Sequence, residues 1–343
     1  MHQKKSVIMS KHLVLLTPGF PENENDSSII PALQIFVKRL IDTQPDLKIK
    51  IVAFQYPFSE NQYQWNGVDV IALNGQNKRA NKLLVWFKAF KTLRRINKQN
   101  KIDIIHSFWL RECSFVGRVY IQKNKIKHLI TAMGQDVLKY NKYAKFCSQK
   151  ATIITLSQFQ SKIFYQNYGI KSLIIPWGID RSEFPKLKNK TIDILGVGSL
   201  NEVKNYPLFI RVIERLHKSG LIIKVEILGG GTLEEQVINN IKSSGLQEVI
   251  KLSGEIKREE VLNKMAKAKI LLHTSTFESF GMVFIEALYS GMKIVSNEVG
   301  IAKKSSSWYV CNGESEMEIA IIRALKEKID RELIFNVNET VNS

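Results

Sequence analysis

The feature that most constrains the fold of this chain is a regular alternation of short β-branched runs with amphipathic helical stretches, which continues along its whole length. The short runs are apolar throughout, so they indicate strands that are buried on both faces. Burial by helices on both sides is typical of parallel sheets in α/β proteins. We therefore predict an α/β fold built from doubly wound parallel sheets.

The first half of the chain carries this pattern clearly. Its predicted strands are His12–Pro18, Lys48–Phe54, Val68–Leu73, Ile102–Phe108, His128–Met133, Ala151–Leu156 and Ser172–Pro176. Helical spacing of apolar residues predicts helices at Pro31–Ile41, Lys82–Asn97, Cys113–Lys123 and Gln158–Tyr168.

The second half repeats the pattern after a polar segment. Its predicted strands are Thr191–Val197, Ile222–Leu228, Val249–Leu252, Lys269–His273, Lys293–Ser296 and Ser307–Cys311. Its predicted helices are Tyr206–Lys218, Leu233–Ser243, Arg258–Ala266, Gly281–Ser290 and Glu314–Glu327.

The segment Arg181–Lys190 between the halves is polar, contains Pro185 and has no periodicity, so we interpret it as a linker. We predict a domain of residues 1–183 and a domain of residues 184–343, facing each other across a cleft. In doubly wound sheets, ligands bind outside the carboxyl ends of the strands.

The net charge of +18 is unevenly distributed between these halves. Residues 1–183 hold 28 Lys/Arg and 12 Asp/Glu, whereas residues 184–343 hold 22 and 20. A strongly cationic half is expected to meet an anionic partner, such as nucleic acid, membrane phospholipid or a phosphorylated acceptor. A genomic bias towards lysine is the alternative explanation for part of the excess.

The positive charge is concentrated in Lys78–Lys101, which holds nine Lys/Arg and no acidic residue. Helical spacing places an apolar face on Leu83, Trp86, Phe87, Phe90 and Leu93. A basic amphipathic helix with aromatic residues can lie on an anionic bilayer. The candidate membrane or acceptor surface comprises Lys88, Lys91, Arg94 and Arg95, although a sheet-packing helix with a solvated charged face would show the same pattern.

Several classes of protein and location are disfavoured by the sequence. The longest apolar runs are strand-sized, far below the ~18–20 residues that a membrane span needs. Lys11 and His12 interrupt the apolar N-terminal stretch, so we expect no signal peptide. The cysteines (Cys113, Cys147 and Cys311) are odd in number and scattered, which argues against a disulfide framework or a CxxC metal site. We expect a cytoplasmic protein that is peripheral on the inner face of the membrane.

The stretch His273–Ser296 is the richest in candidate functional residues. Glu278 precedes a predicted helix whose first N–H groups, at Phe280–Val283, suit a phosphate. Glu286 lies inside an apolar run, where a buried carboxylate requires a polar partner such as a ribose diol. Taken singly, Glu278 could be a helix-start acid favoured by the helix dipole, and Glu286 a partly exposed position.

Taken together, Glu278 and Glu286 form the E-x7-E pattern of retaining GT-B glycosyltransferases, and the chain resembles glycosyltransferase family 4. Four other segments resemble motifs of that family. They are Ser172–Phe184 at the domain junction, Gly196–Leu216 as the entry to the second domain, the Gly-rich turn Val225–Glu235, and the strand Val249–Ile256.

The resemblance implies roles for individual residues. Glu286 would bind the donor ribose, Glu278 would lie at the transferred sugar, and Lys204 would neutralise the diphosphate. The other implied donor-binding residues are Gly19, Gly198, Ser199, Glu255, Ser279, Phe280, Gly281 and Met282. A fixed cation with helix N–H groups stabilises a departing diphosphate, so no metal or cofactor is expected.

The sequence also departs from the family pattern. Ser199 stands where the family has an Arg, and Arg181 is a possible substitute. Met133 stands where the family has a His in the motif that ends at Asp136, so His106 and Asp136 are the candidate catalytic residues of the first domain. A hydrogen-bonded residue at a strand end is the alternative interpretation of His106.

These observations predict a glycosyltransferase that moves a sugar from a nucleotide-diphosphate donor to an acceptor hydroxyl with retention, in cell-surface polysaccharide or glycolipid assembly. The expected partners are the donor, a glycan or lipid-linked acceptor and an anionic membrane. The alternatives are a catalytically impaired nucleotide-sugar-binding subunit, a GT-B nucleotide-sugar epimerase, and a nucleic-acid-binding protein, for which the sequence offers charge but no motif.

Overall fold

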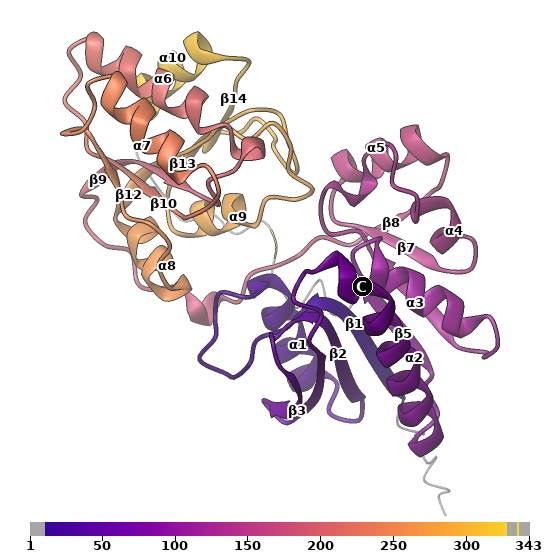
Figure 1. Ribbon diagram of the computed structural model, residues 1–343. Coiled ribbons are helices and arrows are strands. Elements are labelled where there is room, and N and C mark those ends of the chain that lie inside the picture. The colour runs from indigo at the N-terminus through magenta and orange to yellow at the C-terminus, as the bar shows by residue number, and fades with distance from the viewer. Residues whose placement is uncertain (1–10, 328–334, 336–343) are drawn as a thin grey trace, which may run out of the picture. The chain divides into compact units, whose positions relative to one another are not determined.

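The computed structural model describes residues 11–327 and residue 335. Contacts between residues divide the chain into two compact units (Figure 1). The first unit ends at Ile175 and the second begins at Pro176, with the short segment Ser157–Gln160 assigned to the second. The predicted boundary after Glu183 lies shortly beyond this division.

The first unit contains a mostly parallel sheet with the strand order β3-β4-β2-β1-β5-β6-β7-β8. Its strands are β1 (His12–Gly19), β2 (Lys48–Tyr56), β3 (Glu60–Trp65), β4 (Val68–Leu73), β5 (Ile104–Phe108), β6 (Lys127–Thr131), β7 (Thr152–Thr155) and β8 (Leu173–Ile174). Its helices are α1 (Pro31–Thr43), α2 (Lys82–Gln99), α3 (Glu112–Ile121), α4 (Ala144–Ser148) and α5 (Gln158–Tyr168). Helices α2 and α3 pack against each other.

The second unit has a parallel sheet with the order β11-β10-β9-β12-β13-β14, the arrangement of a doubly wound nucleotide-binding fold. Its strands are β9 (Ile192–Val197), β10 (Val225–Leu228), β11 (Ile250–Leu252), β12 (Ala268–His273), β13 (Lys293–Ser296) and β14 (Trp308–Val310). Its helices are α6 (Tyr206–Lys218), α7 (Glu234–Ser243), α8 (Arg258–Lys267), α9 (Met282–Tyr289) and α10 (Glu314–Ala324). Figure 1 shows α6, α7 and α10 grouped together, with α8 and α9 apart from them.

The core of the second unit explains why these segments form these elements. Helix α6 buries Leu208, Val212 and Leu216, which follow helical spacing along one face. They pack with fully buried strand residues such as Ile194 and Ile227. Strands that are apolar on both faces therefore lie between helical layers, and the predicted α/β class with two doubly wound units is confirmed.

Two elements of the first unit were not predicted. Strand β3 pairs antiparallel with β4 and forms a hairpin at the sheet edge, which departs from the all-parallel expectation. Its sequence, ENQYQW, is polar and mostly exposed, so the apolar pattern that revealed the other strands is missing. The other addition is α4, a single short turn of helix.

The predicted apolar face of α2 is partly wrong. Leu83 and Phe87 are 74% and 67% exposed, and Leu84 is also exposed. The buried face instead comprises Val85, Ala89, Thr92, Leu93 and Ile96, with Trp86 and Phe90 packed at its margin. The face that packs against the sheet thus carries smaller side chains such as Val85 and Ala89, and the larger Leu83 and Phe87 face away from the core.

The surface of the first unit therefore presents apolar and basic side chains on one helix. The exposed apolar and basic residues of α2 are Leu83, Leu84, Phe87, Lys91, Arg94, Arg95 and Lys98. Within the described residues, no helix combines the length and the apolar character needed to cross a bilayer.

Candidate active site

The candidate site of the second unit lies where the strand order of its sheet reverses. Strands β9 and β12 are adjacent, and the chain leaves both of them at their carboxyl ends. The loop after β9 leads to Lys204, and the loop after β12 leads to Glu278. Ligands of doubly wound sheets bind at this position.

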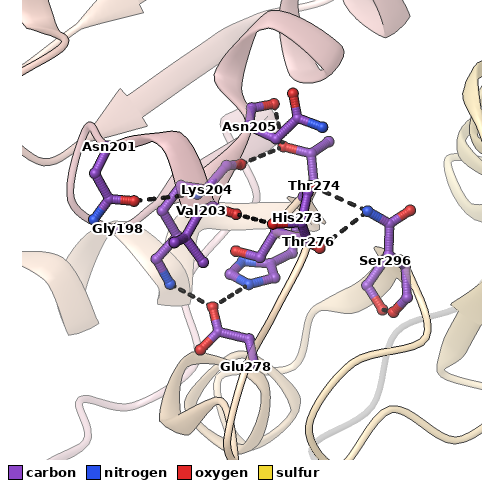
Figure 2. Close-up of polar contacts among 12 residues, drawn as sticks. Gly198, Asn201, Val203, Lys204, Asn205, His273, Thr274, Thr276, Glu278 and Ser296 are labelled. Atoms are coloured by element: carbon purple, nitrogen blue, oxygen red, sulfur yellow. Dashed lines mark hydrogen bonds and ion pairs between the residues drawn. The ribbon is translucent and has the colours of Figure 1, made fainter. Parts of the chain in front are cut away.

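The loop after β9 is shaped by Gly198, whose φ of 148° lies in a region that side chains rarely adopt. A Cβ atom at this position would lie 2.9 Å from Cε of Lys204. The carbonyl of Gly198 accepts a hydrogen bond from the Tyr206 hydroxyl at 3.1 Å. Asn201 Oδ1 accepts one from the Lys204 N–H at 3.2 Å, as Figure 2 shows. The glycine therefore allows the lysine side chain to lie directly over the turn.

Hydrogen bonds join this loop to the loop after β12, as Figure 2 shows. The Thr274 hydroxyl donates to the carbonyl of Lys204 at 2.9 Å, and the Thr276 N–H donates to the carbonyl of Val203 at 2.8 Å. The backbones that carry Lys204 and Glu278 are thus held together, although these residues are far apart in the sequence.

Lys204, Glu278 and His273 form a compact charged cluster. Lys204 Nζ lies 2.5 Å from Glu278 Oε1, and His273 Nε2 lies 3.0 Å from the same oxygen (Figure 2). Burial alone would raise the pKa of Glu278, but the hydrogen bond from His273 and the charge of Lys204 lower this pKa to about 2. Glu278 is therefore ionised at neutral pH, and it can accept hydrogen bonds from sugar hydroxyls but cannot act as a proton donor.

His273 supports this cluster as a neutral group. The imidazole is fully buried in the last position of β12, and burial lowers its pKa below the usual value. Because a carboxylate accepts hydrogen bonds and cannot donate them, Nε2 of the neutral ring carries the proton. The sequence analysis did not identify His273, although its place at the end of a strand before Glu278 was visible.

Helix α9 begins where the sequence predicted. Gly281 is the residue before its first turn and has a φ of 88°, and a Cβ atom there would lie 2.4 Å from Cδ2 of Phe284. The first N–H groups of a helix have no acceptors within it. Those of α9 come shortly after Glu278, the ion-pair partner of Lys204.

Glu286 is buried on α9 and is engaged by Arg258, the first residue of α8. Its Oε1 accepts a hydrogen bond from Arg258 Nη1 at 2.6 Å, and Arg258 also pairs with Glu183 at 3.1 Å. The side chains of Arg258 and Glu286 are only 15% and 8% exposed. The prediction that Glu286 needs a polar partner is confirmed, and the alternative of a partly exposed residue is wrong. Sequence analysis did not identify Arg258, because this pairing links two helices.

The remaining donor-site candidates of the second unit follow the strands β9, β11 and β12. Ser199 is exposed on the turn after β9, and Glu255 lies beside Gly230, whose Cβ would be 3.8 Å from Glu255 Oε2. Ser279, Phe280 and Met282 lie between Glu278 and the first turn of α9. Arg181 was named as a substitute for the missing arginine. It is exposed, in the short 3-10 turn Arg181–Glu183 at the start of the predicted linker.

The candidates of the first unit are buried. His106 is 7% exposed in β5, and its Nε2 lies 2.7 Å from the Thr131 hydroxyl. Burial lowers the pKa of His106 to about 3. This geometry matches the alternative of a hydrogen-bonded strand residue, and a catalytic role for His106 stays a prediction.

Asp136 and Gly19 have structural surroundings that the sequence did not reveal. Asp136 accepts hydrogen bonds from the N–H groups of Leu110 at 2.7 Å and Gly134 at 2.9 Å. Burial raises its pKa despite these bonds. Gly19 is the last residue of β1 and lies opposite Tyr56 of β2. Asp136 therefore organises the loop after β6.

No cluster of three or more His, Cys, Asp or Glu side chains suited to a metal ion occurs among the described residues. The groups that can stabilise negative charge near Glu278 are Lys204 and the first N–H groups of α9.

Comparisons with known proteins agree with this architecture. The model of the glycosyl transferases group 1 family matches residues 179–331, and a glycosyl transferase 4-like model matches residues 31–167. An uncharacterized glycosyltransferase of Methanocaldococcus jannaschii is 24% identical over 281 residues, which cover 79% of this chain and 76% of that protein.

Two further relatives inform the interpretation. An N-acetylgalactosaminyltransferase of Campylobacter jejuni that acts on a diphospho-undecaprenol-linked sugar is 35% identical over 112 residues, 33% of this chain and 29% of that protein. The solved structure of HepE from Anabaena with UDP and glucose has a TM-score of 0.68 at 16% identity and covers 92% of this chain and 90% of that one. At this identity the structural similarity shows the fold alone.

The two family matches and the two doubly wound units together define a GT-B architecture. The chain is therefore identified as a GT-B glycosyltransferase, and its second unit matches the glycosyl transferases group 1 model.

Proposed function

We propose that this protein transfers a sugar from a nucleoside-diphosphate donor to an acceptor hydroxyl with retention of anomeric configuration. The observation that carries the proposal is the Lys204–Glu278–His273 cluster beside the first turn of α9. An ammonium group and free N–H groups in a partly buried place stabilise the negative charge that develops on a departing diphosphate. The UDP and glucose bound in the HepE structure support the same class of donor.

The low pKa of Glu278 limits its role in this reaction. An ionised carboxylate cannot protonate the leaving group, so we assign it to binding hydroxyls of the transferred sugar and to holding Lys204. Lys204 then provides the charge that neutralises the diphosphate. We expect catalysis without a metal ion, so turnover should persist in EDTA, and its abolition would contradict this assignment.

Glu286 is proposed to bind the donor ribose, with Arg258 holding its carboxylate in place. Glu286→Ala is expected to weaken nucleoside-diphosphate binding by ~1–3 kcal/mol, the cost of a lost hydrogen bond to a charged group. Glu183→Ala is a matched control, because it also removes a carboxylate partner of Arg258 but not the proposed ribose contact. Equal losses of affinity in both variants would assign Glu286 to structure alone.

The reaction itself is tested with a panel of UDP-, GDP-, ADP- and CMP-sugars. Hydrolysis of one donor in the absence of acceptor is expected, and proton NMR of the sugar released first should show the anomeric configuration of the donor. Release of the opposite anomer would overturn retention. Tight binding of a donor without any turnover would instead favour the impaired subunit suggested by Ser199.

We also propose that the first unit docks on an anionic membrane through α2, where a lipid-linked acceptor is available. Leu83, Leu84 and Phe87 are exposed near its beginning, followed by exposed Lys91, Arg94 and Arg95. Lys88 contributes less, because its Nζ pairs with Glu60 at 2.6 Å. Exposed apolar side chains can insert at a bilayer surface, and basic side chains on the same helix attract anionic headgroups. The lipid-linked substrate of the Campylobacter jejuni relative supports an acceptor of this kind.

A further inference from the structure

A cavity of about 1020 Å³ lies wholly within the first unit, and none of its lining residues belongs to the Lys204–Glu278 cluster. Its wall is formed at the carboxyl ends of β1 and β2 and by the segments after β4, β5 and β6. Strands β1 and β5 are the neighbours at which the order of this sheet reverses, so the cavity occupies the usual ligand position of a doubly wound fold.

The cavity is lined by an excess of cations. They are Lys78, Arg79, Lys82, Arg111, Lys139 and Lys142. Only two carboxylates line it, and both are engaged. Glu112 pairs with Lys82 at 3.0 Å, and Asp136 accepts backbone hydrogen bonds.

The other five cations have no carboxylate within ion-pair distance among the residues that the structure describes. All five are exposed, and they come from three separate segments that the sheet brings to one edge. Cations gathered around a concave surface concentrate anions there, because their fields add. The positive charge of these five side chains therefore favours binding of an anionic ligand in the cavity.

Aromatic residues give the cavity a second recognition element. Trp109 and Tyr140 both line it and both have positive φ values, 65° and 68°, in a region that bulky residues seldom adopt. Tyr140 is 96% exposed, so its ring is available for contact with a ligand. An aromatic ring beside several cations suits a ligand that joins a sugar to phosphate.

We propose that this cavity binds the phosphate or diphosphate group of a phosphorylated glycan acceptor. The inference rests on the proposed function, because it treats the cavity as the acceptor site of the same transfer reaction. Arg79 and Arg111 offer paired N–H donors to phosphate oxygens, and Lys78, Lys139 and Lys142 supply charge around them. The exposed Leu83 and Leu84 directly follow the cavity residue Lys82, where an apolar anchor on the phosphate would continue.

The test uses inorganic pyrophosphate as the probe, in protein that carries Lys204→Met to weaken the donor site. Calorimetry should show that binding persists in this background. Adding Arg79→Gln, Arg111→Gln and Lys139→Gln should weaken it by about tenfold or more, the loss expected for charge-assisted hydrogen bonds. A matched control adds Lys123→Gln, Lys125→Gln and Lys150→Gln, which remove the same charge from exposed positions of the first unit.

Similar losses in the cavity variant and the control would overturn the proposal, because overall charge would then explain binding. Absence of pyrophosphate binding in the Lys204→Met protein would overturn it as well.

The source of the phosphate is tested with vesicles of phosphatidylglycerol and phosphatidylcholine. A cavity variant that sediments less than wild type while binding pyrophosphate normally would assign the cations to bilayer headgroups and refute an acceptor site.

Failure of this inference can be told apart from failure of the proposed function. With Lys204 intact, the cavity variant should still bind the nucleoside diphosphate, because Lys204 and Glu278 are unchanged in it. If no nucleotide sugar is bound or hydrolysed by the wild type, the proposed function fails, whatever the result with pyrophosphate.

Discussion

The two units share a doubly wound strand order, but their charged side chains are arranged differently at the carboxyl ends of the strands. In the second unit, Lys204 pairs with Glu278 and Arg258 with Glu286, and all four side chains are at most 20% exposed. In the first unit, Arg79, Arg111 and their neighbours are exposed around an open cavity.

This difference has a physical consequence. Partly buried pairs hold each other in fixed positions, so a ligand meets an electrostatic environment that is already organised. Exposed cations are solvated and adaptable, so they favour attraction and capture over precise positioning. Variants in the second unit should therefore affect catalysis and stability, whereas variants in the first should affect recruitment.

The largest expected effect is that of Lys204→Met. Loss of the charge beside the departing diphosphate should lower turnover by about 10²–10³-fold, as for removal of one transition-state donor. Nucleoside-diphosphate binding should weaken more than nucleoside binding, because the charge acts only on phosphates. Lys224→Met, at an exposed position of the same unit, is the control for kinetics and binding. Equal losses for both ligands would show that Lys204 supports structure instead.

The next effect is on stability. Arg258→Met leaves the buried carboxylate of Glu286 without its partner, and breaking such a pair costs about 3 kcal/mol. Denaturant unfolding should show this loss, and Lys242→Met, at an exposed lysine, should change little. A variant as stable as wild type would show that Glu286 is hydrated or protonated once Arg258 is gone, which would weaken the contrast between the units.

Most helices and strands could be predicted from the sequence, whereas most contacts between charged side chains could not. Helix α6 and strand β4 have their predicted limits, because their apolar spacing is strong and local. Glu278, Glu286 and Lys204 were identified through a motif, and the structure brings Glu278 and Lys204 together.

What the sequence left undetermined depends on contacts between distant segments. Arg258 acquires its role from Glu286 on another helix, and no local pattern marks it. His273 lies five residues before its partner Glu278, but only the folded loop shows that the two side chains meet. The buried face of α2 was also misjudged, because side-chain size favoured Leu83 and Phe87 whereas the fit to the sheet favoured Val85 and Ala89.

The third prediction concerns recruitment by the first unit. Changing Lys91, Arg94 and Arg95 to Glu should abolish co-sedimentation with anionic vesicles, because each basic residue near such a surface is worth ~1 kcal/mol. Wild type should bind anionic vesicles, should not bind neutral ones, and should be released by salt. The control changes Lys224, Lys242 and Lys251 of the second unit to Glu and should still bind. If wild type and the α2 variant sediment alike, α2 is not the docking surface.

The fourth prediction is a difference in acid sensitivity between the two units. Burial lowers the pKa values of His106 and His128 in the first unit to about 3. In the unfolded chain these groups take up protons near pH 6.5, whereas in the folded chain they do not. The free energy of unfolding should therefore fall as the pH drops below about 6.5, by ~1.4 kcal/mol per pH unit for each histidine.

The second unit should lose stability from Glu278 only in stronger acid. Its folded pKa of about 2 lies below the unfolded value, so its contribution is complete above about pH 4.3 and disappears as the pH falls through 2. Burial also lowers the pKa of His273, so protonation of this ring in the unfolded chain lowers the free energy of unfolding somewhat below pH 6.5.

Urea unfolding at pH 7 and pH 5 measures how much of the pH-dependent loss of stability comes from each unit. The double variant His106→Gln, His128→Gln should flatten the pH dependence more than His273→Gln does, and an unchanged slope in the double variant would show that both rings are protonated in the folded state.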